Sequence, residues 1–352
     1  MSASAVAARP RTRLDERTRS ILRYAVGVTA ACAVGLGISW PLSYTVPLLA
    51  AAVLVPGGKS LTPKGAIAFV AVVAGASAFG LVVSAVLLPY SGAFLLMMAW
   101  LLMAVFYGST GDRSPLVTMW LLIALTVIPL VSLQSGFLAL VIAQSLVIST
   151  AVAMLCVWFA AALFPWPAAT ASAEQLAAQQ PALPPGPDAR VVSALKSTAV
   201  VYPMLLVFLF FNLAESALIL IFVALLAQNP SLGAGKTAGT AMIAANTAGG
   251  LLAILIYNLL IAVPTFYYLL VLVLLAGLLF GQLITSNWKY AKLGGMAFST
   301  VLLIIGSTTT STTDAGSKVL TRVLQIVAAV VYLVIAFGLI EKFAHGRRLR
   351  NA

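Results

Sequence analysis

Three charged residues near the end of the chain, Asp314, Lys318 and Arg322, are spaced four residues apart. This spacing places them on one face of a helix, with the acid before the bases, an order that favours pairing. A charge inside a membrane is costly and usually faces the interior of a helix bundle or a water-filled cavity. Two interpretations therefore stay open: an anion-attracting path lined by Arg322, and a ladder of salt bridges at the outer surface.

Carboxyl groups that can carry a coupling proton are scarce in the apolar part of the sequence. Glu215 and Asp314 are the two candidates, and each is also explained as a carboxylate at the surface. A proton-driven transporter needs a titratable group in or beside its path. We therefore predict proton coupling at Glu215 or Asp314.

Two side-chain amides of the ninth predicted span, Asn246 and Asn258, have apolar neighbours. Such amides often join membrane helices by hydrogen bonds, and they can equally line a pore. Gln144 aligns with Arg322 when the two halves of the sequence are superimposed, so the first half offers a neutral polar group at that place. The predicted substrate-binding residues are Arg322, Gln144, Asn246 and Asn258.

Enzyme chemistry finds few suitable residues in this sequence. The single histidine, His345, lies in the C-terminal tail, and Cys32 and Cys156 lie in the middle of apolar runs. These residues have neither the spacing of a metal site nor that of a nucleophile and its base. The segment GAGKT at 233–237 lacks the first glycine of a P-loop, because Pro230 occupies that place. We therefore predict that the protein is not an enzyme and uses no cofactor and no metal.

The composition is that of a chain whose solvent is mostly lipid. Hydrophobic residues make up 62% of the sequence and charged residues 8%, and the mean hydropathy is +1.09. A soluble domain carries about 25% charged residues, so this chain lacks the charge to cover a water-facing surface. Its net charge of +12 is spread over tails and short loops, which argues against nucleic-acid binding.

The elements that position the candidate residues are predicted to be membrane-spanning helices. A bilayer core about 30 Å thick needs roughly 20 apolar residues per helix, and Pro, Gly and charge clusters divide the chain into about twelve such runs. The second and eighth runs are short and are interpreted as tilted or half-buried helices. The predicted spans lie near 21–39, 42–56, 65–88, 93–107, 115–132, 136–164, 195–211, 214–228, 237–262, 266–284, 293–310 and 318–341.

The two halves of the sequence resemble each other. Each half opens with a basic residue, Arg23 or Lys196, and runs through two apolar spans to a Gly-rich basic loop before a long third span. Six helices per half bring both halves into the membrane from the same side, so the predicted fold is an all-α polytopic membrane protein of two parallel six-helix repeats. Its predicted parts are a basic tail (1–20), the first repeat (21–164), a Pro-rich linker (165–193), the second repeat (194–343) and a basic tail (344–352).

Basic residues mark one side of the membrane. With twelve spans, both tails, the linker and the loops after even-numbered helices share that side. Of the 20 Lys and Arg residues, only Lys318 and Arg322 fall outside it. Loops rich in Lys and Arg remain in the cytoplasm, so both termini are predicted to be cytoplasmic.

Several short motifs accompany the paired halves. The Gly-rich basic loops are GGKSLTPKG (57–65) and NPSLGAGKT (229–237), and the last span contains TRVLQI (321–326). In this layout the chain resembles the fusaric acid resistance and aromatic acid exporter superfamily over about residues 20–343. The resemblance implies a multi-pass protein of the bacterial inner membrane that exports small organic anions, with a periplasmic adaptor of the membrane-fusion type as partner. The larger exporters carry a sizeable cytoplasmic domain between their halves, for which the linker at 165–193 is too short, so the route of energy coupling stays open.

The predicted function is secondary transport: export of small organic, chiefly aromatic, acid anions across the inner membrane. The alternatives are a passive anion channel with the same pore and no coupling acid, and a scaffold subunit that needs a partner for transport. The expected partners are the lipid bilayer, the small organic anion and the periplasmic adaptor, and no nucleic acid. Whether the chain forms a homo-oligomer is left open.

Overall fold

The computed structural model shows a protein that is helical wherever it is described. The described residues are 15–56, 61–110, 115–166, 186–213, 217–227, 232–288, 290–291, 293–309, 320–321, 324–325, 327–336 and 338–339. No strand occurs in these ranges, in agreement with the predicted all-α class.

The described residues fold into a succession of helices. Their bounds are α1 (Glu16–Ile38), α2 (Thr45–Val53), α3 (Pro63–Leu87), α4 (Ser91–Ser109), α5 (Pro115–Gln134), α6 (Gly136–Leu163), α8 (Pro187–Phe210), α9 (Ala217–Leu226), α10 (Leu232–Ala262), α11 (Phe266–Ile284) and α12 (Leu293–Thr309). A further apolar helix covers Val327–Ala336.

Most helices begin close to their predicted starts, because local capping groups mark these places. α3 begins after Thr62, whose hydroxyl oxygen accepts a hydrogen bond from the N–H of Gly65 at 3.1 Å. α11 begins after Thr265, which caps the N–H of Tyr268, and it covers the predicted span 266–284. A threonine in this position satisfies one of the free N–H groups of the first helical turn.

Three helices begin at least five residues before the predicted starts of their spans, and one of them is α10, which begins at Leu232 instead of near 237. α1 begins at Glu16, inside the predicted tail (1–20), and α8 begins at Pro187, inside the predicted linker (165–193). Glu16 and Asp188 place an acid in the first turn, and Pro187 supplies the backbone angle that a first helical residue needs. The predicted spans start at the first apolar residue of each run, whereas the helices begin with the more polar residues before it.

Eight of the described helices are long and apolar enough to cross a membrane, namely α1, α3, α4, α5, α6, α8, α10 and α11. α2 has 9 residues and α9 has 10, which is shorter than a span and agrees with their interpretation as tilted or half-buried helices. α12 and the helix Val327–Ala336 are also apolar over the residues that the structure describes. The eight long apolar helices support a multi-pass membrane protein.

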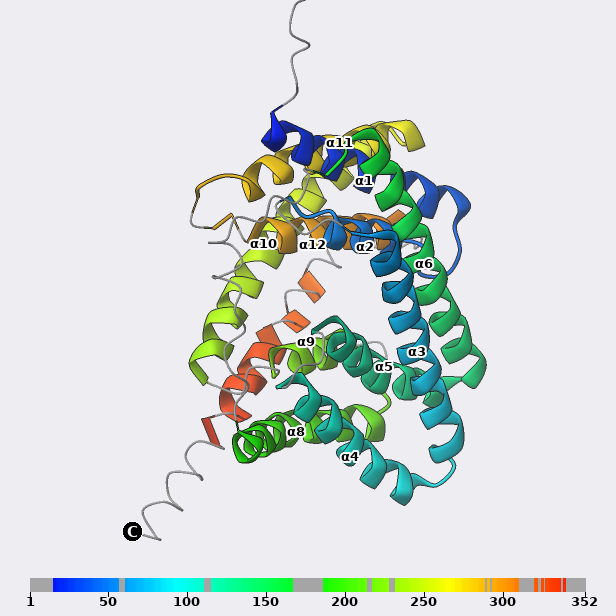
Figure 1. Ribbon diagram of the computed structural model, residues 1–352, viewed down its shortest axis with the longest axis vertical. Coiled ribbons are helices and arrows are strands. Elements are labelled where there is room, and N and C mark those ends of the chain that lie inside the picture. Colours follow the sequence, from blue (N-terminus) through cyan, green and yellow to red (C-terminus); the bar gives the residue numbers. More distant parts are fainter. Residues whose placement is uncertain are drawn as a thin grey trace, which may run out of the picture.

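The helices form two bundles, at the top and the bottom of Figure 1. The first bundle has a core made by α1, α2, α11 and α12 with the end of α6 and the middle of α10. The second has a core made by α4, α5, α8, α9 and the helix Val327–Ala336. α3 and α6 run side by side from one bundle toward the other, and α10 does so on the opposite side (Figure 1).

Helices from distant parts of the sequence pair in both bundles. α1 packs along α11, and α8 packs along α4. α3 lies on α5 and α10 lies on α12, while α2 meets α12 and α9 meets α5. Neither bundle is therefore built from one half of the sequence alone.

Glycines allow the closest of these contacts. Gly277 and Gly281 of α11 face α1, and a Cβ at Gly277 would lie 3.0 Å from the Cα of Ala25. Gly80 of α3 lies against α5, where a Cβ would lie 2.9 Å from the carbonyl oxygen of Ala124. Small residues four apart let membrane helices approach in this way, since van der Waals packing rather than the hydrophobic effect holds them together in lipid.

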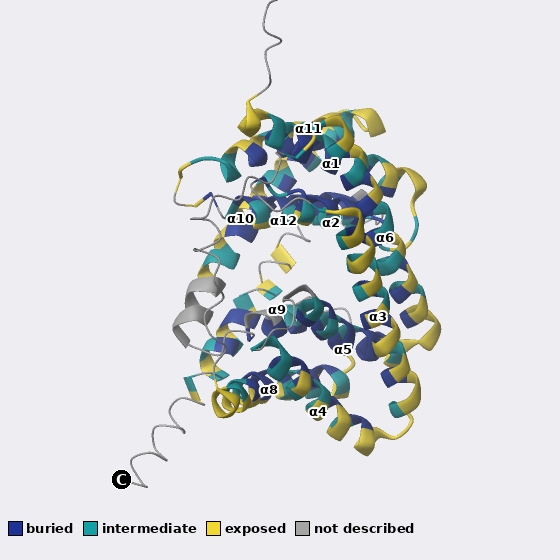
Figure 2. Ribbon diagram, viewed as in Figure 1, coloured by how far each residue is buried: buried dark blue, intermediate teal, exposed yellow. Residues whose placement is uncertain are grey.

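The outward faces of the helices are exposed (Figure 2), and they carry large apolar side chains. Leu96 is 76% exposed, Phe137 77% and Trp100 65%. Exposed apolar surface of this extent is unusual on a soluble monomer, and it fits contact with lipid chains.

Candidate functional site

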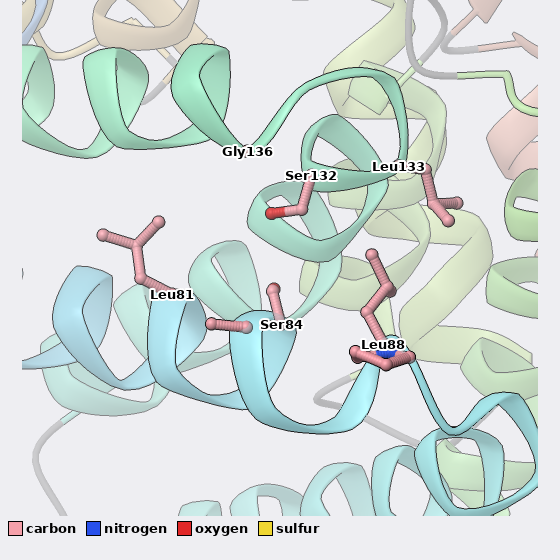
Figure 3. A pocket seen from close by; sticks show the side chains of 8 residues that line it. Leu81, Ser84, Leu88, Ser132, Leu133 and Gly136 are labelled. Atoms are coloured by element: carbon pink, nitrogen blue, oxygen red, sulfur yellow. The ribbon is translucent and has the colours of Figure 1, made fainter.

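Two adjoining grooves follow one face of α3. The first, of about 430 Å³, lies between the end of α3, the end of α5 and the start of α6. Figure 3 shows Leu81, Ser84 and Leu88 of α3 around it, with Ser132 and Leu133 of α5. The second, of about 550 Å³, lies between the middle of α3 and α6, and it shares Leu81 with the first.

Small residues on both helices create the second groove. Its walls include Ala74, Ser77 and Ala78 on α3 and Ala143 on α6. These short side chains leave space outside the line of contact between α3 and α6, whereas longer ones, including Val147 and Ile148, form its edges. Ser135 caps the N-terminus of α6 by accepting a hydrogen bond from the N–H of Leu138, which fixes the turn between α5 and α6.

Isolated polar groups interrupt the apolar walls. The hydroxyl of Ser84 donates to the carbonyl of Gly80 at 2.7 Å, and that of Ser132 donates to the carbonyl of Ile128 at 2.8 Å. Their oxygen lone pairs remain able to accept. The side chain of Gln144 is exposed at the second groove and makes no hydrogen bond to the described part of the chain. No charged residue is part of either lining.

Among the predicted substrate residues that the structure describes, Gln144 alone lines one of the two grooves. Asn246 is 4% exposed, and its amide is engaged: its Nδ2 donates to the carbonyl of Met242 at 2.8 Å, and its Oδ1 accepts from Thr300 at 2.7 Å. This bond joins α10 to α12, which favours the helix-joining interpretation of Asn246. Asn258 lies on the exposed face of α10. The structure does not bring these three residues together.

The other predicted functional residues lie outside the described part of the chain. They are Arg322, Glu215 and Asp314, together with Lys318. Their predicted roles in anion binding and proton coupling therefore stay predictions.

The structure adds Arg23, which in the sequence only opens the first repeat and adds to the count of basic residues. Arg23 of α1 is 2% exposed, and its Nη1 donates to the carbonyls of Phe164 and Pro165 at 3.3 and 3.4 Å. Its guanidinium lies 3.8 Å from the ring centre of Trp166. No acidic side chain of the described residues pairs with it, so carbonyl oxygens at the end of α6 and an aromatic face hold a buried cation.

Arg190 at the start of α8 makes a related contact. It donates to the carbonyl of Tyr107 at 3.3 Å, and its guanidinium lies 4.4 Å from the centre of the same ring. In each case an arginine of one helix holds the C-terminal end of another, α6 for Arg23 and α4 for Arg190. In the sequence, each of these arginines is only a basic residue beside an apolar run. That pattern does not indicate which helix the arginine contacts.

Comparisons with known proteins cover part of the chain. Residues 20–160 match the model of a family described as a protein of unknown function (DUF2955). The matched residues include most of α1, all of α2 to α5 and most of α6. No curated protein matches the chain, and no solved structure does.

Proposed function

We propose that the protein is a secondary transporter that exports small organic, chiefly aromatic, acid anions across the bacterial inner membrane. The observation that carries this proposal is the groove between α3 and α6. It combines apolar walls with the hydroxyl of Ser77 and the unpaired amide of Gln144. Ligand sites for small molecules are mostly apolar, measure roughly 300–1,000 Å³ and hold a few polar groups that orient the ligand.

The charge balance favours an anion as the substrate. The chain carries 20 basic and 8 acidic residues, and the one buried charge in the described part is the cation Arg23. In the proposal, Arg322 of the second half supplies the charge that compensates the anion for its lost hydration. Glu215 or Asp314 carries the driving proton.

The same proposal includes two parallel six-helix repeats that span the membrane twelve times, with both termini in the cytoplasm. The pairing of helices supports it, since several pairs have a counterpart six positions along the predicted order of spans. α1 on α11 corresponds to α8 on α4, and α3 on α5 corresponds to α10 on α12. The family match to residues 20–160 supports it as well, because these limits are close to those of the predicted first repeat.

A flux measurement tests the proposal. Purified protein in liposomes, loaded with a labelled aromatic carboxylate such as benzoate, is expected to move it in response to an imposed proton gradient. Glu215→Gln or Asp314→Asn should abolish this gradient-driven flux and leave anion exchange intact. Flux that follows membrane voltage, and that is the same in both variants, would favour the passive channel. No flux without an added adaptor protein would favour the scaffold.

A substitution in the groove tests the proposed substrate site. Gln144→Leu removes the amide while keeping a side chain of similar size, and the loss of one hydrogen bond is expected to raise KM by about two- to tenfold. The matched control is Gln282→Leu, which changes an exposed glutamine of α11 outside both grooves. An unchanged KM in Gln144→Leu would remove the groove from the transport path.

A further inference from the structure

The ends of two membrane-length helices meet where α1 begins and α11 ends. The Nε of Arg17 donates to the hydroxyl of Thr285 at 3.2 Å. Further along, α1 and α11 pack through Gly277 and Gly281 against Ala25 and Ile21. Because both helices have the length and composition of a span, their joint end lies at the boundary of the apolar layer.

An exposed aromatic pair follows directly after α11. The rings of Trp288 and Tyr290 lie 5.1 Å apart in an edge-to-face arrangement, yet Trp288 is 55% and Tyr290 45% exposed. The N–H of Ala291 donates to the carbonyl of Trp288 at 2.9 Å, which holds the backbone of this turn. Tryptophan and tyrosine gather at membrane–water interfaces, where the ring contacts lipid and the polar edge contacts headgroups.

Basic residues lie near this pair in the sequence and at the start of α1, which packs against α11, whereas the sequence at the other end of α11 has none. Arg17 and Arg19 lie on the first turns of α1, and the sequence places Lys289 and Lys292 beside the aromatic residues. Two carboxylates, Asp15 and Glu16, also lie there, at the N-terminus of α1, which a helix dipole stabilises. The bases still outnumber the acids.

The start of α11 provides the comparison. Phe266 and Tyr267 are exposed there, Tyr267 by 81%. The sequence from 257 to 268 contains no charged residue. Aromatic residues thus mark both ends of the helix, but only one end combines them with positive charge.

We propose that Arg17, Trp288 and Tyr290 bind the phosphate headgroup of an anionic phospholipid. The guanidinium pairs with the phosphate oxygens, for which its fork of N–H donors is suited. The two rings hold the glycerol and the upper part of the acyl chains, as exposed aromatic side chains do at the interface. The site is independent of the proposed transport activity.

Tryptophan fluorescence tests this site in the full chain. The protein is reconstituted in phosphatidylcholine vesicles in which a fixed fraction of lipid carries bromine on its acyl chains, either as phosphatidylglycerol or as phosphatidylcholine. Bromine quenches nearby tryptophan, and the difference between the wild type and Trp288→Phe isolates Trp288 among the six tryptophans. One basic residue near the surface enriches an anionic lipid by about fivefold, so brominated phosphatidylglycerol should quench Trp288 far more strongly.

Matched variants separate the site from general effects of charge and folding. Arg17→Gln should remove the preference for phosphatidylglycerol, and Arg17→Lys, which keeps the charge, should retain most of it. Lys64→Gln, which removes an exposed charge at the start of α3, should leave the preference unchanged. A Tyr267→Trp reporter in the Trp288→Phe protein should show no preference.

Three outcomes would overturn the proposal. One is equal quenching of Trp288 by the two brominated lipids, and another is a preference that survives in Arg17→Gln. The third is loss of the preference when millimolar inorganic phosphate is added, since the site would then bind free phosphate rather than a lipid.

Discussion

Arg23 shows how a single side chain can remain charged inside a membrane protein without an acidic partner. Removal of a guanidinium from water is costly unless its N–H groups find acceptors. Here the acceptors are the carbonyls of Phe164 and Pro165 at the end of α6, and the ring of Trp166 covers one face. The contact ties α1 to the residues that lead into the predicted linker.

We expect Trp166→Leu to destabilise the protein by about 1–2 kcal/mol, because a desolvated cation–π contact has roughly this strength. Trp166→Phe keeps an aromatic face and should lose less than half as much. Thermal unfolding in detergent, followed by the retention of a monodisperse species, measures both. Equal losses in the two variants would show that ring size, and not the contact with Arg23, sets the stability.

Arg322 supports a second prediction at the level of a residue. Arg322→Lys keeps the charge but loses the two-pronged contact with a carboxylate, and Arg322→Gln copies Gln144 of the first half and loses the charge as well. A charge-assisted hydrogen bond contributes about 1.5–3 kcal/mol, so transport affinity should fall roughly ten- to a hundredfold in Arg322→Gln and less in Arg322→Lys.

The measurement is transport activity per folded molecule. The rival interpretation, a structural ladder with Asp314 and Lys318, predicts less protein in the membrane with normal activity per molecule. Normal activity of folded Arg322→Gln would exclude Arg322 as a substrate residue.

At the scale of elements, the close crossing of α1 and α11 depends on glycines, which have no side chain. A Cβ at Gly277 would lie 3.0 Å from the backbone of α1, while one at Gly75 on α3 meets nothing within 4 Å. Gly277→Leu should therefore separate the two helices and destabilise the fold by about 1–3 kcal/mol, the usual range for overpacking. Gly75→Leu adds the same side chain at an open position and should have little effect on the unfolding temperature. A similar fall in the unfolding temperature of both variants would mean that the membrane, and not the packing of α1 against α11, disfavours the larger side chain.

Helix bounds could largely be predicted because they depend on neighbouring residues in the sequence. Thr62 and Thr265 cap helices that begin where the apolar runs begin. The start of α8 at Pro187 was missed because Pro187 and Asp188 signal a helix start without being apolar. The number of true spans and the repeat stay predictions, since length and hydropathy alone do not show how α2, α9 and α12 lie in a bilayer.

The candidate site could be predicted only in part. Gln144 is predicted from its alignment with Arg322 of the second half, but its neighbour across the groove, Ser77, depends on the packing of α3 on α6. The bond between Asn246 and Thr300 joins residues 54 positions apart, and the contact of Arg23 with Phe164 joins residues 141 apart. A pattern of neighbouring residues in the sequence does not predict contacts between residues so far apart.

At the scale of the whole molecule, the pairing of α1 with α11 makes a covalent test possible. In a protein without Cys32 and Cys156, Ala25→Cys and Gly277→Cys should form a disulfide on mild oxidation. A Cβ at 277 lies 3.2 Å from that of Ala25, close to the separation of about 3.8 Å found in disulfides. After proteolytic cutting at a site inserted in the predicted linker, the two fragments should then migrate as one species without reductant.

The control pair is Ala25→Cys with Gly295→Cys, a position after the predicted linker where a Cβ would meet nothing within 4 Å. This pair should not join. If the fragments of the protein with Ala25→Cys and Gly277→Cys separate without reductant, α1 and α11 do not lie together in the membrane.

Each bundle contains helices from both halves of the sequence, and this has a consequence for biosynthesis. α1 leaves the ribosome early, but its partner α11 does not exist until most of the chain has been translated. At about 5–20 residues per second, this delay is on the order of 10 to 50 s. During it, the face of α1 that carries Ile21 and Ala25 has only lipid or an insertion factor for contact. Translation speed and membrane chaperones should therefore influence the yield of this protein more than that of a chain whose neighbouring helices pair as they emerge.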